Sequence, residues 1–347
     1  MAELPESSFI ALVMAGGRGT RFWPMSQDEK PKQYLTLFGE RTLIQSTIDR
    51  LKKQTPVTNI FICSGDSQKE ILKTQLPEIS QLILEPSGRN TAPCLMLSVA
   101  TLLQKGYPAS TVMGVFPADH FIGNDSEFSK LLALAILQAK NSRCLFTLGI
   151  TPSSPLTGYG YIEAGSPTGS GTFIVDKFIE KPSLDKASEY VSKQNFFWNA
   201  GIFIWRLDVI SQAFATYLPL EWDLIQSAVK DGTITDAYPK LTSQPIDTAI
   251  LEKAKNVQVI PAKMEWSDIG SWSALLDHHQ TLSPKSIVII PEQNKMVKSI
   301  NSSDCLLVTD SNKKIVLIGV KDLIIVDSKE GLLITHRSQD QRVKEIT

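Results

Sequence analysis

The apolar run Phe9-Ile-Ala-Leu-Val-Met-Ala15 continues directly into Gly16-Gly-Arg-Gly-Thr-Arg21, and this stretch decides how the fold begins. The first part is apolar throughout, as expected of a strand covered on both faces. The glycines of the second part allow a tight turn whose N–H groups can form a nest for an anion. Arg18 and Arg21 add planar cations that suit phosphate oxygens. A shorter glycine motif would more often be a surface turn with solvated arginines, but this longer one predicts a phosphate-binding loop after a buried strand.

Strands and helices alternate along most of the remaining chain. Further apolar runs predict strands at 59–63, 82–84, 112–116 and 144–148, and amphipathic stretches predict helices at 42–53, 92–104 and 127–140. More strands are expected between 157 and 206, and helices return between 207 and 253. This alternation predicts an α/β fold with a Rossmann-like, mixed and mainly parallel sheet flanked by helices.

The tail of the chain, from about Pro284, has a different pattern. Four short apolar runs begin at Cys305, Ile315, Leu323 and Leu332, which are 8 to 10 residues apart, with Asp, Asn, Lys and Gly between them. Such spacing predicts a small coil or sandwich of strands. The runs carry no group typical of catalysis, and we expect this tail to act in packing or oligomerisation.

The composition excludes some classes of protein. The 347 residues include 35 basic and 36 acidic ones, with a formal net charge of −1, so nucleic acid is not expected as a main partner. The four cysteines form no C-x-x-C motif. No run reaches the roughly 18 continuous apolar residues of a membrane span. We therefore expect a cytoplasmic protein without a membrane partner.

Two aspartates far apart in the chain are candidates for a metal site. Asp119 follows the apolar run 112–116, and ligand sites in open α/β sheets lie beyond the carboxyl ends of strands. Asp268 stands in Glu265-Trp-Ser-Asp-Ile-Gly-Ser-Trp272, before a predicted helix. Magnesium is typically bound by one or two carboxylates together with substrate phosphates and water. Taken singly, an aspartate after a strand is more often a turn former or a helix cap.

Glu85 is a candidate for recognising a nucleotide base. It lies in Leu84-Glu-Pro-Ser-Gly-Arg-Asn-Thr-Ala-Pro93, between a predicted strand and a predicted helix. A carboxylate can accept hydrogen bonds from N1–H and N2–H of guanine, whereas adenine presents an acceptor at N1. The alternative is a surface residue at the end of a strand. In the same way, Gly160 permits close approach to a sugar ring and Glu163 could accept from its hydroxyls, but both could be ordinary surface residues.

The motifs around the glycine loop resemble those of the sugar nucleotidyltransferases. That family has a G-G-x-G-T-R loop, then W-P, then P-K, and this chain has Gly16-Gly-Arg-Gly-Thr-Arg21, Trp23-Pro24 and Pro31-Lys32. The form of these motifs resembles the short monofunctional bacterial mannose-1-phosphate guanylyltransferases in particular. The resemblance spans roughly residues 9–280. It implies a Mg²⁺-dependent in-line reaction of GTP with α-D-mannose 1-phosphate, giving GDP-mannose and pyrophosphate.

The resemblance also implies roles for individual residues. Asp119 and Asp268 stand in segments that carry the two metal ligands of the family, and Phe178-Ile-Glu-Lys-Pro182 and Trp198-Asn-Ala-Gly-Ile-Phe203 resemble its sugar-binding segments. The catalytic residues would be Arg18, Arg21, Lys32 and Lys181. The nucleotide would contact Ala15, Gly16, Gly17, Gly19, Thr20, Glu85, Asn90 and Thr91. The sugar would contact Gly160, Glu163, Glu180 and Asn199.

His120, beside one of the implied metal ligands, is not expected to act as a general base. The attacking group is a phosphate monoester, whose second pKa of about 6 leaves it already an anion near neutral pH. Catalysis would instead rest on alignment and on neutralisation of phosphate charge.

The implied domains are a nucleotidyltransferase catalytic domain over 1–283 and a β-helix-like domain over 284–347. The family's tail is implicated in dimerisation, so we expect a homodimer. Because the chain ends at Thr347, we expect neither the cupin-type isomerase domain of the longer bifunctional relatives nor its activity. Three alternatives remain open: the same chemistry with a heptose or glucose 1-phosphate or another nucleoside triphosphate, a non-catalytic protein that retains the nucleotide pocket, and a glycosyltransferase that uses GDP-mannose.

Overall fold

The structure is a computed structural model that describes residues 9–17, 19–282, 287–291, 297–310 and 313–346. The chain divides into two compact units. Unit 1 consists of Met1–Gly16, Ile48–Pro117 and Ile122–Trp266, and unit 2 consists of Gly17–Thr47, Ala118–Phe121 and Ser267–Thr347. The domain boundary predicted between residues 283 and 284 lies outside the described residues, and it stays a prediction.

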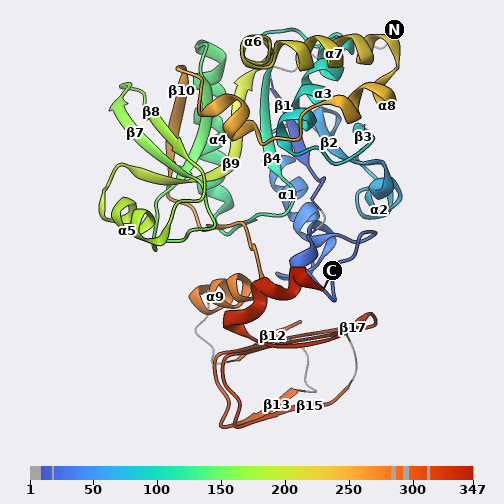
Figure 1. Cartoon of the computed structure of the whole chain (residues 1–347), viewed down its shortest axis with the longest axis vertical. Helices are drawn as coiled ribbons and strands as arrows, with labels where there is room; N and C mark the ends of the chain where they lie inside the picture. The colour runs from blue at the N-terminus through green and yellow to red at the C-terminus, as the bar shows by residue number, and fades with distance from the viewer. Residues whose placement is uncertain (1–8, 18, 283–286, 292–296, 311–312, 347) are drawn as a thin grey trace. The chain divides into compact units, whose positions relative to one another are not determined.

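Unit 1 is built on a nine-stranded sheet with the order β3-β2-β1-β4-β9-β6-β10-β8-β7 (Figure 1). The strands are β1 (Phe9–Met14), β2 (Ile60–Gly65), β3 (Leu82–Glu85), β4 (Val112–Pro117), β6 (Leu145–Ile150), β7 (Tyr161–Pro167), β8 (Phe173–Ile179), β9 (Phe196–Arg206) and β10 (Val257–Ala262). Strands β8 and β9 pair antiparallel with their neighbours, and the other seven of the nine run in one direction. The sheet is therefore mixed and mainly parallel, as predicted.

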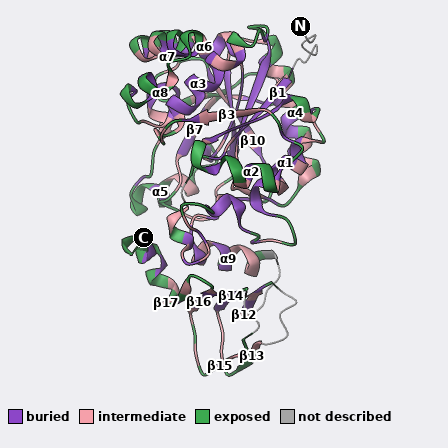
Figure 2. Cartoon of the chain, turned by 90° about the vertical axis from the view of Figure 1, so that its right-hand side faces the viewer, coloured by how far each residue is buried: buried purple, intermediate pink, exposed green. Residues whose placement is uncertain are grey.

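Helices cover both faces of this sheet. Side chains alternate along a strand, so Ile10 and Leu12 share one face, which packs in one core with α3 (Thr91–Gln104), α6 (Leu207–Tyr217) and α7 (Pro219–Asp231). On β4, Phe116 points to the other face, where its ring lies 6.1 Å from that of Phe128 in α4 (Asp125–Asn141). The remaining helices are α1 (Leu43–Leu51), α2 (Lys69–Gln75), α5 (Leu184–Ser192), α8 (Ile234–Ala237) and α9 (Trp272–Leu282). Burial on both faces explains why the strands are apolar throughout (Figure 2).

Unit 2 contains a coil of parallel strands. The strands β12 (Ile287–Ile290), β14 (Cys305–Thr309) and β16 (Leu323–Ser328) pair in one sheet, and β13 (Val297–Ile300) pairs with β15 (Ile315–Ile318) in another. Val288 pairs with Leu306 and Leu306 with Ile324, so one turn of the coil takes 18 residues (306 − 288 = 324 − 306 = 18). The last strand, β17 (Gly331–His336), pairs antiparallel with β16. Of the two predictions left open for the tail, the coil is confirmed.

Two apolar layers hold unit 2 together. The inside of the coil is filled by side chains such as Cys305, Leu307 and Ile325. The alternate residues of the same strands, such as Leu306 and Ile324, face outward into a second core that also holds Phe22, Leu35 and residues of α9. The glycine-loop segment after residue 17 is thereby packed against the coil within one unit.

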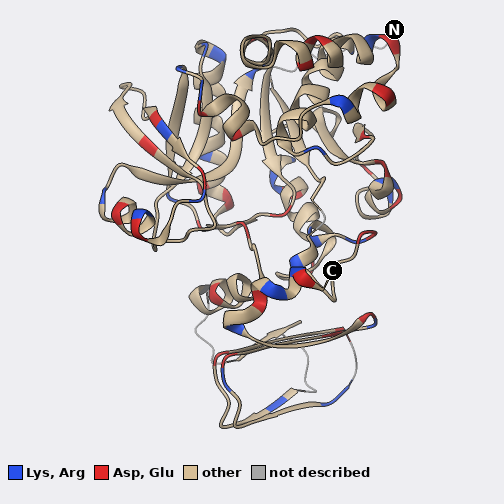
Figure 3. Cartoon of the chain, viewed as in Figure 1, with Lys and Arg blue, Asp and Glu red and all other residues tan. Residues whose placement is uncertain are grey.

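Charged side chains are distributed over the elements of the described chain rather than gathered by sign (Figure 3). Among the described residues, no helix combines the length and the hydropathy that crossing a bilayer requires.

Candidate active site

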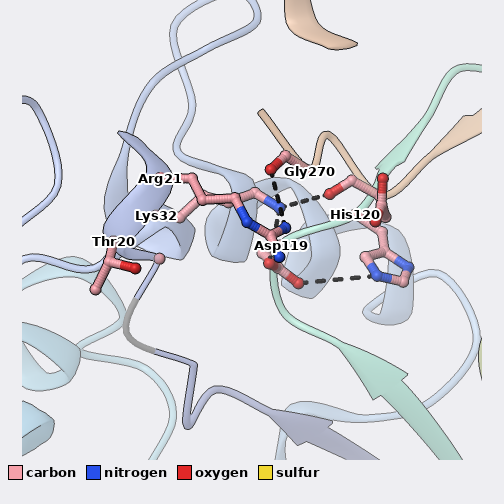
Figure 4. Close-up of a pocket in the computed structure, with 8 residues that line it drawn as sticks. Thr20, Arg21, Lys32, Asp119, His120 and Gly270 are labelled. Carbon is pink, nitrogen blue, oxygen red and sulfur yellow. Dashed lines mark hydrogen bonds and ion pairs between the residues drawn. The ribbon is translucent and has the colours of Figure 1, made fainter. Parts of the chain in front are cut away.

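A cavity of about 530 Å³ in unit 2, here called the loop pocket, is lined by residues from three distant parts of the sequence. Its lining residues are Gly19, Thr20, Arg21, Lys32, Asp119, His120, Asp268 and Gly270. Thr20 and Arg21 belong to the short helix η1 (Thr20–Phe22), and Lys32 begins the short helix η2 (Lys32–Tyr34). Figure 4 shows Lys32 and Asp119 pointing toward one another in this pocket.

Gly19 is required by the shape of the loop. Its φ is +60°, and a Cβ atom at this position would lie 2.5 Å from Cβ of Lys32 and 2.6 Å from the Lys32 backbone nitrogen. No side chain fits at such distances, because the obstruction includes backbone. The glycine loop therefore rests directly on Lys32, and the adjoining Gln33 amide donates to the Gly17 carbonyl at 3.2 Å.

Lys32 links the two aspartates. Its Nζ donates to Oδ2 of Asp119 at 2.8 Å and to the backbone oxygen of Asp268 at 2.5 Å. The Lys32 side chain is only 7% exposed, and a buried ammonium needs such compensation because leaving water is costly for an ion. The ring of Phe22 lies 5.6 Å from Nζ and adds a cation–π contact.

The Asp119 carboxylate is held in its ionised form by its neighbours. Burial alone would raise the pKa of Asp119, but attraction to Lys32 and His120 outweighs it and lowers the pKa below its ordinary value. Nε2 of His120 lies 3.9 Å from Oδ1 of Asp119. An anionic carboxylate is the form that can ligate a hard metal ion.

Arg21 and the segment after Asp268 complete the pocket. Nη1 of the exposed Arg21 side chain donates to the backbone oxygen of Gly270 at 3.3 Å. Ile269 has a φ of +43°, which is rare for a β-branched residue. The predicted catalytic residue Arg18 lies outside the described residues. Of the phosphate and metal residues predicted from the sequence, the structure thus brings together Thr20, Arg21, Lys32, Asp119 and Asp268.

A second group of predicted residues lies at the carboxyl ends of β1 and β3 in unit 1. Glu85 ends β3, and its Oε2 would lie 3.0 Å from a Cβ atom at Gly16, just after β1 and Ala15. The hydroxyl of Tyr238 donates to Oε1 of Glu85. Burial raises the pKa of Glu85 and the bond from Tyr238 opposes that rise. Only 4% of Glu85 is exposed, so it is not the surface residue that the alternative interpretation described.

Asn90 and Thr91 form the start of α3. Asn90 has a φ of +67° with an extended ψ of −174°, a combination that is strained for any residue except glycine, and its side chain accepts from the Thr91 backbone N–H at 2.8 Å. Oγ1 of Thr91 accepts from the backbone N–H of Ile246 at 2.8 Å. The loop after β3 is therefore tied to the segment before residue 247.

A third group in unit 1, here called the Asn199 cluster, consists of Gly160, Glu180, Asn199 and Asp247. A Cβ atom at Gly160 would lie 3.0 Å from Oε2 of Glu180 and 3.7 Å from Cβ of Asn199. The Asn199 amide donates to Oδ1 of Asp247 at 2.7 Å. The structure brings three predicted sugar contacts together around a glycine, and adds an aspartate that the sequence analysis did not predict.

Lys181 and Glu163 lie near this cluster in sequence but differ in setting. Nζ of Lys181 pairs with Oε1 of Glu180 at 2.8 Å, and the Lys181 backbone has a φ of +41°. Before β12, the described non-glycine residues with positive φ are Asn90, Lys181 and Ile269, and all three stand in predicted site motifs. Glu163 lies on β7 opposite Phe196, where its charge attracts Lys193 rather than a member of the Asn199 cluster.

Two residues of these groups, Tyr238 and Asp247, had no signal in the sequence. Both lie in the helical stretch that was predicted only as packing, and their partners are 153 and 48 residues away. A polar residue inside an otherwise apolar helical pattern was the one available hint.

The chain matches known families over both of its parts. Residues 10–285 match the nucleotidyl transferase family, and residues 295–347 match a MannoseP isomerase/GMP-like beta-helix domain. These matches agree with the α/β fold and with the strand coil of the tail.

Relatives and solved structures extend the similarity over nearly the whole chain. The mannose-1-phosphate guanylyltransferase of Salmonella muenchen is 34% identical over 357 residues, which cover 98% of this chain and 73% of that protein. The mannose-1-phosphate guanylyltransferase of Escherichia coli is 33% identical over 355 residues, covering 97% and 72%. The crystal structure of a mannose-1-phosphate geranyltransferase from Thermus thermophilus is 29% identical, with a TM-score of 0.88 and 98% of each chain covered.

Proposed function

The chain belongs to the nucleotidyl transferase family, among the mannose-1-phosphate guanylyltransferases, and from this we propose that it joins GTP and α-D-mannose 1-phosphate into GDP-mannose and pyrophosphate. The observation that carries the proposal is the bridge made by Lys32 between Asp119 and the Asp268 backbone beneath the glycine loop. Cations, carboxylates and a glycine turn in one cavity suit a polyphosphate.

The proposed chemistry is an in-line displacement. A phosphate oxygen of the sugar phosphate attacks the α-phosphorus of GTP, and the bond from that phosphorus to the bridging oxygen of the β-phosphate breaks. Arg21 and Lys32, together with Arg18, stabilise the charge that develops on the departing pyrophosphate. The attacking oxygen is already ionised near neutral pH, so His120 need not remove a proton.

A divalent metal ion fits the loop pocket. Asp119 is ionised and, like Asp268, supplies the oxygen ligands that Mg²⁺ prefers, and both line the same cavity. Mg²⁺ bound by these two residues would neutralise charge on the reacting phosphates. Lys32, held against Asp119, keeps that carboxylate oriented toward the cavity.

The guanine would be recognised by Glu85. Its Oε1 accepts from Tyr238 and its Oε2 lies toward Gly16, so one oxygen is held while the other faces the glycine loop. The adjoining Ala15, Gly16, Gly17, Gly19 and Thr20 would contact the nucleotide through backbone groups. Asn90 and Thr91 would contact the base or the ribose, in keeping with the backbone strain at Asn90.

The mannose would bind at the Asn199 cluster. Glu180, Asn199 and Gly160 would contact its hydroxyls, with Glu163 as a further contact, and Lys181 would orient its phosphate. The positive φ of Lys181 supports this role, because a strained backbone persists where the surrounding structure demands one side-chain direction.

We further propose that the enzyme works in the cytoplasm as a homodimer. The outer faces of the strand coil expose large apolar side chains, including Ile318 at 64%, Ile334 at 61% and Ile300 at 56%. Ile300 and Ile318 are register partners on β13 and β15, so they form a continuous apolar strip that a second copy could cover. The proposal predicts a dimeric mass in solution that Ile318→Asp reduces.

The function is tested by pyrophosphate release. The protein is incubated with Mg²⁺, each of the four nucleoside triphosphates, and mannose, glucose or heptose 1-phosphate. We expect GTP with mannose 1-phosphate to give the highest kcat/KM. Faster release with another pair would contradict the substrate assignment, and no release with any pair would contradict the proposed reaction.

A further inference from the structure

Asp247 occupies an unusual backbone element next to the predicted sugar contacts. It begins a single π-helical turn, Asp247–Leu251, in unit 1. Such turns are rare and occur frequently at functional sites. The side chain is partly exposed beside Asn199. Neither the sequence motifs nor the proposed reaction gives this residue a role.

The amide of Asn199 is held by three hydrogen bonds. Its Oδ1 accepts from the backbone N–H of Gly201 at 3.1 Å and from the hydroxyl of Thr147 at 3.3 Å. Its Nδ2 donates to Oδ1 of Asp247 at 2.7 Å. A backbone N–H can only donate and an ionised carboxylate can only accept, so the two ends of the amide cannot be exchanged. One N–H of Asn199 then remains for a ligand.

The backbone before Asp247 is fixed. The N–H of Ile246 donates to Oγ1 of Thr91, and the carbonyl of Gln244 accepts from the N–H of Ala92 at 3.1 Å. Both bonds attach the segment to the start of α3. Asp247 therefore approaches Asn199 from a rigid support, which a precise orientation requires.

The charge around Asp247 is unfavourable for the folded state. The ionisable side chains whose charges reach it are Glu180 and Glu252, and both are acids. Burial, together with repulsion from Glu180, raises the pKa of Asp247 to about 6, so the carboxylate is still mostly ionised at neutral pH. Such a locally unfavourable choice is expected where function requires it.

We propose that Asp247 is a positioning residue that determines sugar specificity. By holding the Asn199 amide in one orientation, it makes Asn199 a hydrogen-bond donor toward one hydroxyl of the acceptor sugar. A sugar 1-phosphate whose hydroxyl at that position points elsewhere would lose this bond. The inference rests on the proposed role of Asn199 as a sugar contact.

The first test compares Asp247→Ala with Asp247→Asn. The assay uses the sugar 1-phosphate that the unmodified protein uses best. Asp247→Ala should raise the KM for that sugar phosphate ten- to a hundredfold, because the freed amide can rotate, and should change the KM for GTP less than twofold. Asp247→Asn keeps an oxygen that can accept from Asn199 and should change the sugar-phosphate KM less than threefold. Equal loss in both variants, or no loss in either, would overturn the proposal.

A double-mutant cycle tests whether Asp247 acts through Asn199. In the Asn199→Ala background, the further change Asp247→Ala should leave the sugar-phosphate KM unchanged, because the amide to be positioned is gone. It should also no longer alter the ratio of kcat/KM for mannose and glucose 1-phosphates. Additive losses would show a general structural role and refute positioning.

Calorimetric titration with mannose 1-phosphate separates this inference from the proposed reaction. Binding needs no turnover, so a protein that binds the sugar phosphate but releases no pyrophosphate would refute the reaction alone. Asp247→Ala with an unaltered Kd would refute the positioning role alone. Thermal unfolding of each variant shows that a loss of binding does not come from a loss of fold.

Discussion

The loop pocket of unit 2 and the Asn199 cluster of unit 1 place the same kind of side chain in opposite electrostatic settings. In the loop pocket, Asp119 faces Lys32 and His120, and these charges lower its pKa despite burial. In the Asn199 cluster, Asp247 faces the acids Glu180 and Glu252, and its pKa rises to about 6. Burial acts in the same direction in both places, so the neighbours decide the outcome.

The difference matches the ligands proposed for each region. A site for phosphates and a metal ion needs cations and ionised acids together, because each partner neutralises the other before the ligand arrives. A site for sugar hydroxyls needs acceptors without cations, since an ammonium would compete for the same oxygens. Charge pairing thus separates a region suited to ions from a region suited to neutral donors.

The largest expected effect comes from breaking the pairing in the loop pocket. Lys32→Met and Asp119→Asn should each lower kcat/KM for nucleotidyl transfer by roughly 10²–10³, as for removal of a preorganised charge in other active sites. The double variant removes both charges and should recover thermal stability relative to the less stable single variant, yet remain as inactive as either. Steady-state pyrophosphate release and thermal unfolding provide the two measurements.

The matched control for this pair is Lys30→Met, since Lys30 is exposed and two residues away. Its activity should stay within twofold of the unmodified protein. Recovery of activity in the double variant would mean that Lys32 and Asp119 matter only for folding.

The second effect concerns stability and its dependence on pH. Because the pKa of Asp247 is about 6 in the folded protein and 3.8 in its ordinary state, its ionisation destabilises the fold as the pH rises from about 4 to 7. Asp247→Asn cannot ionise, so it should be more stable than the unmodified protein by about 1–3 kcal/mol at pH 8. The difference should vanish at pH 4, as measured by urea unfolding at both values. An equal difference at both pH values would rule out ionisation as its cause.

The smallest expected effect sharpens the comparison with an intermediate case, Glu85, which is buried but held by the neutral hydroxyl of Tyr238. Tyr238→Phe removes that bond, so the pKa of Glu85 should rise further and its carboxylate should lose its orientation. We expect the KM for GTP to rise roughly tenfold and the preference for GTP over ATP to fall. Tyr217→Phe, which removes an exposed bond to the Lys253 carbonyl, is the control and should have no effect. An unchanged KM for GTP in Tyr238→Phe would separate Tyr238 from base recognition.

The loop pocket could be predicted from the sequence because its residues stand in short motifs at the ends of apolar runs. A strand followed by glycines, and an aspartate just after another strand, are local patterns that parallel topology brings to one edge. The sheet itself was predicted for the same reason, since buried strands and amphipathic helices differ in local periodicity.

Tyr238 and Asp247 could not be predicted in this way. Each acts through one contact with a residue far away in sequence, and nothing in the helical pattern around it distinguishes a functional side chain from a packing one. The tail shows a related limit. The spacing of its apolar runs located the strands, but coil and sandwich differ only in which runs pair, and every second run pairs here.

The strand coil has a consequence for how this tail can change in length. Each turn takes 18 residues, and the inward and outward residues of β14 alternate between two separate cores. Inserting or deleting one residue in a strand would exchange these two sets and place each against the wrong partner. Evolution or engineering could therefore lengthen or shorten the tail most safely by whole turns, so that its size is quantised in steps of one repeat.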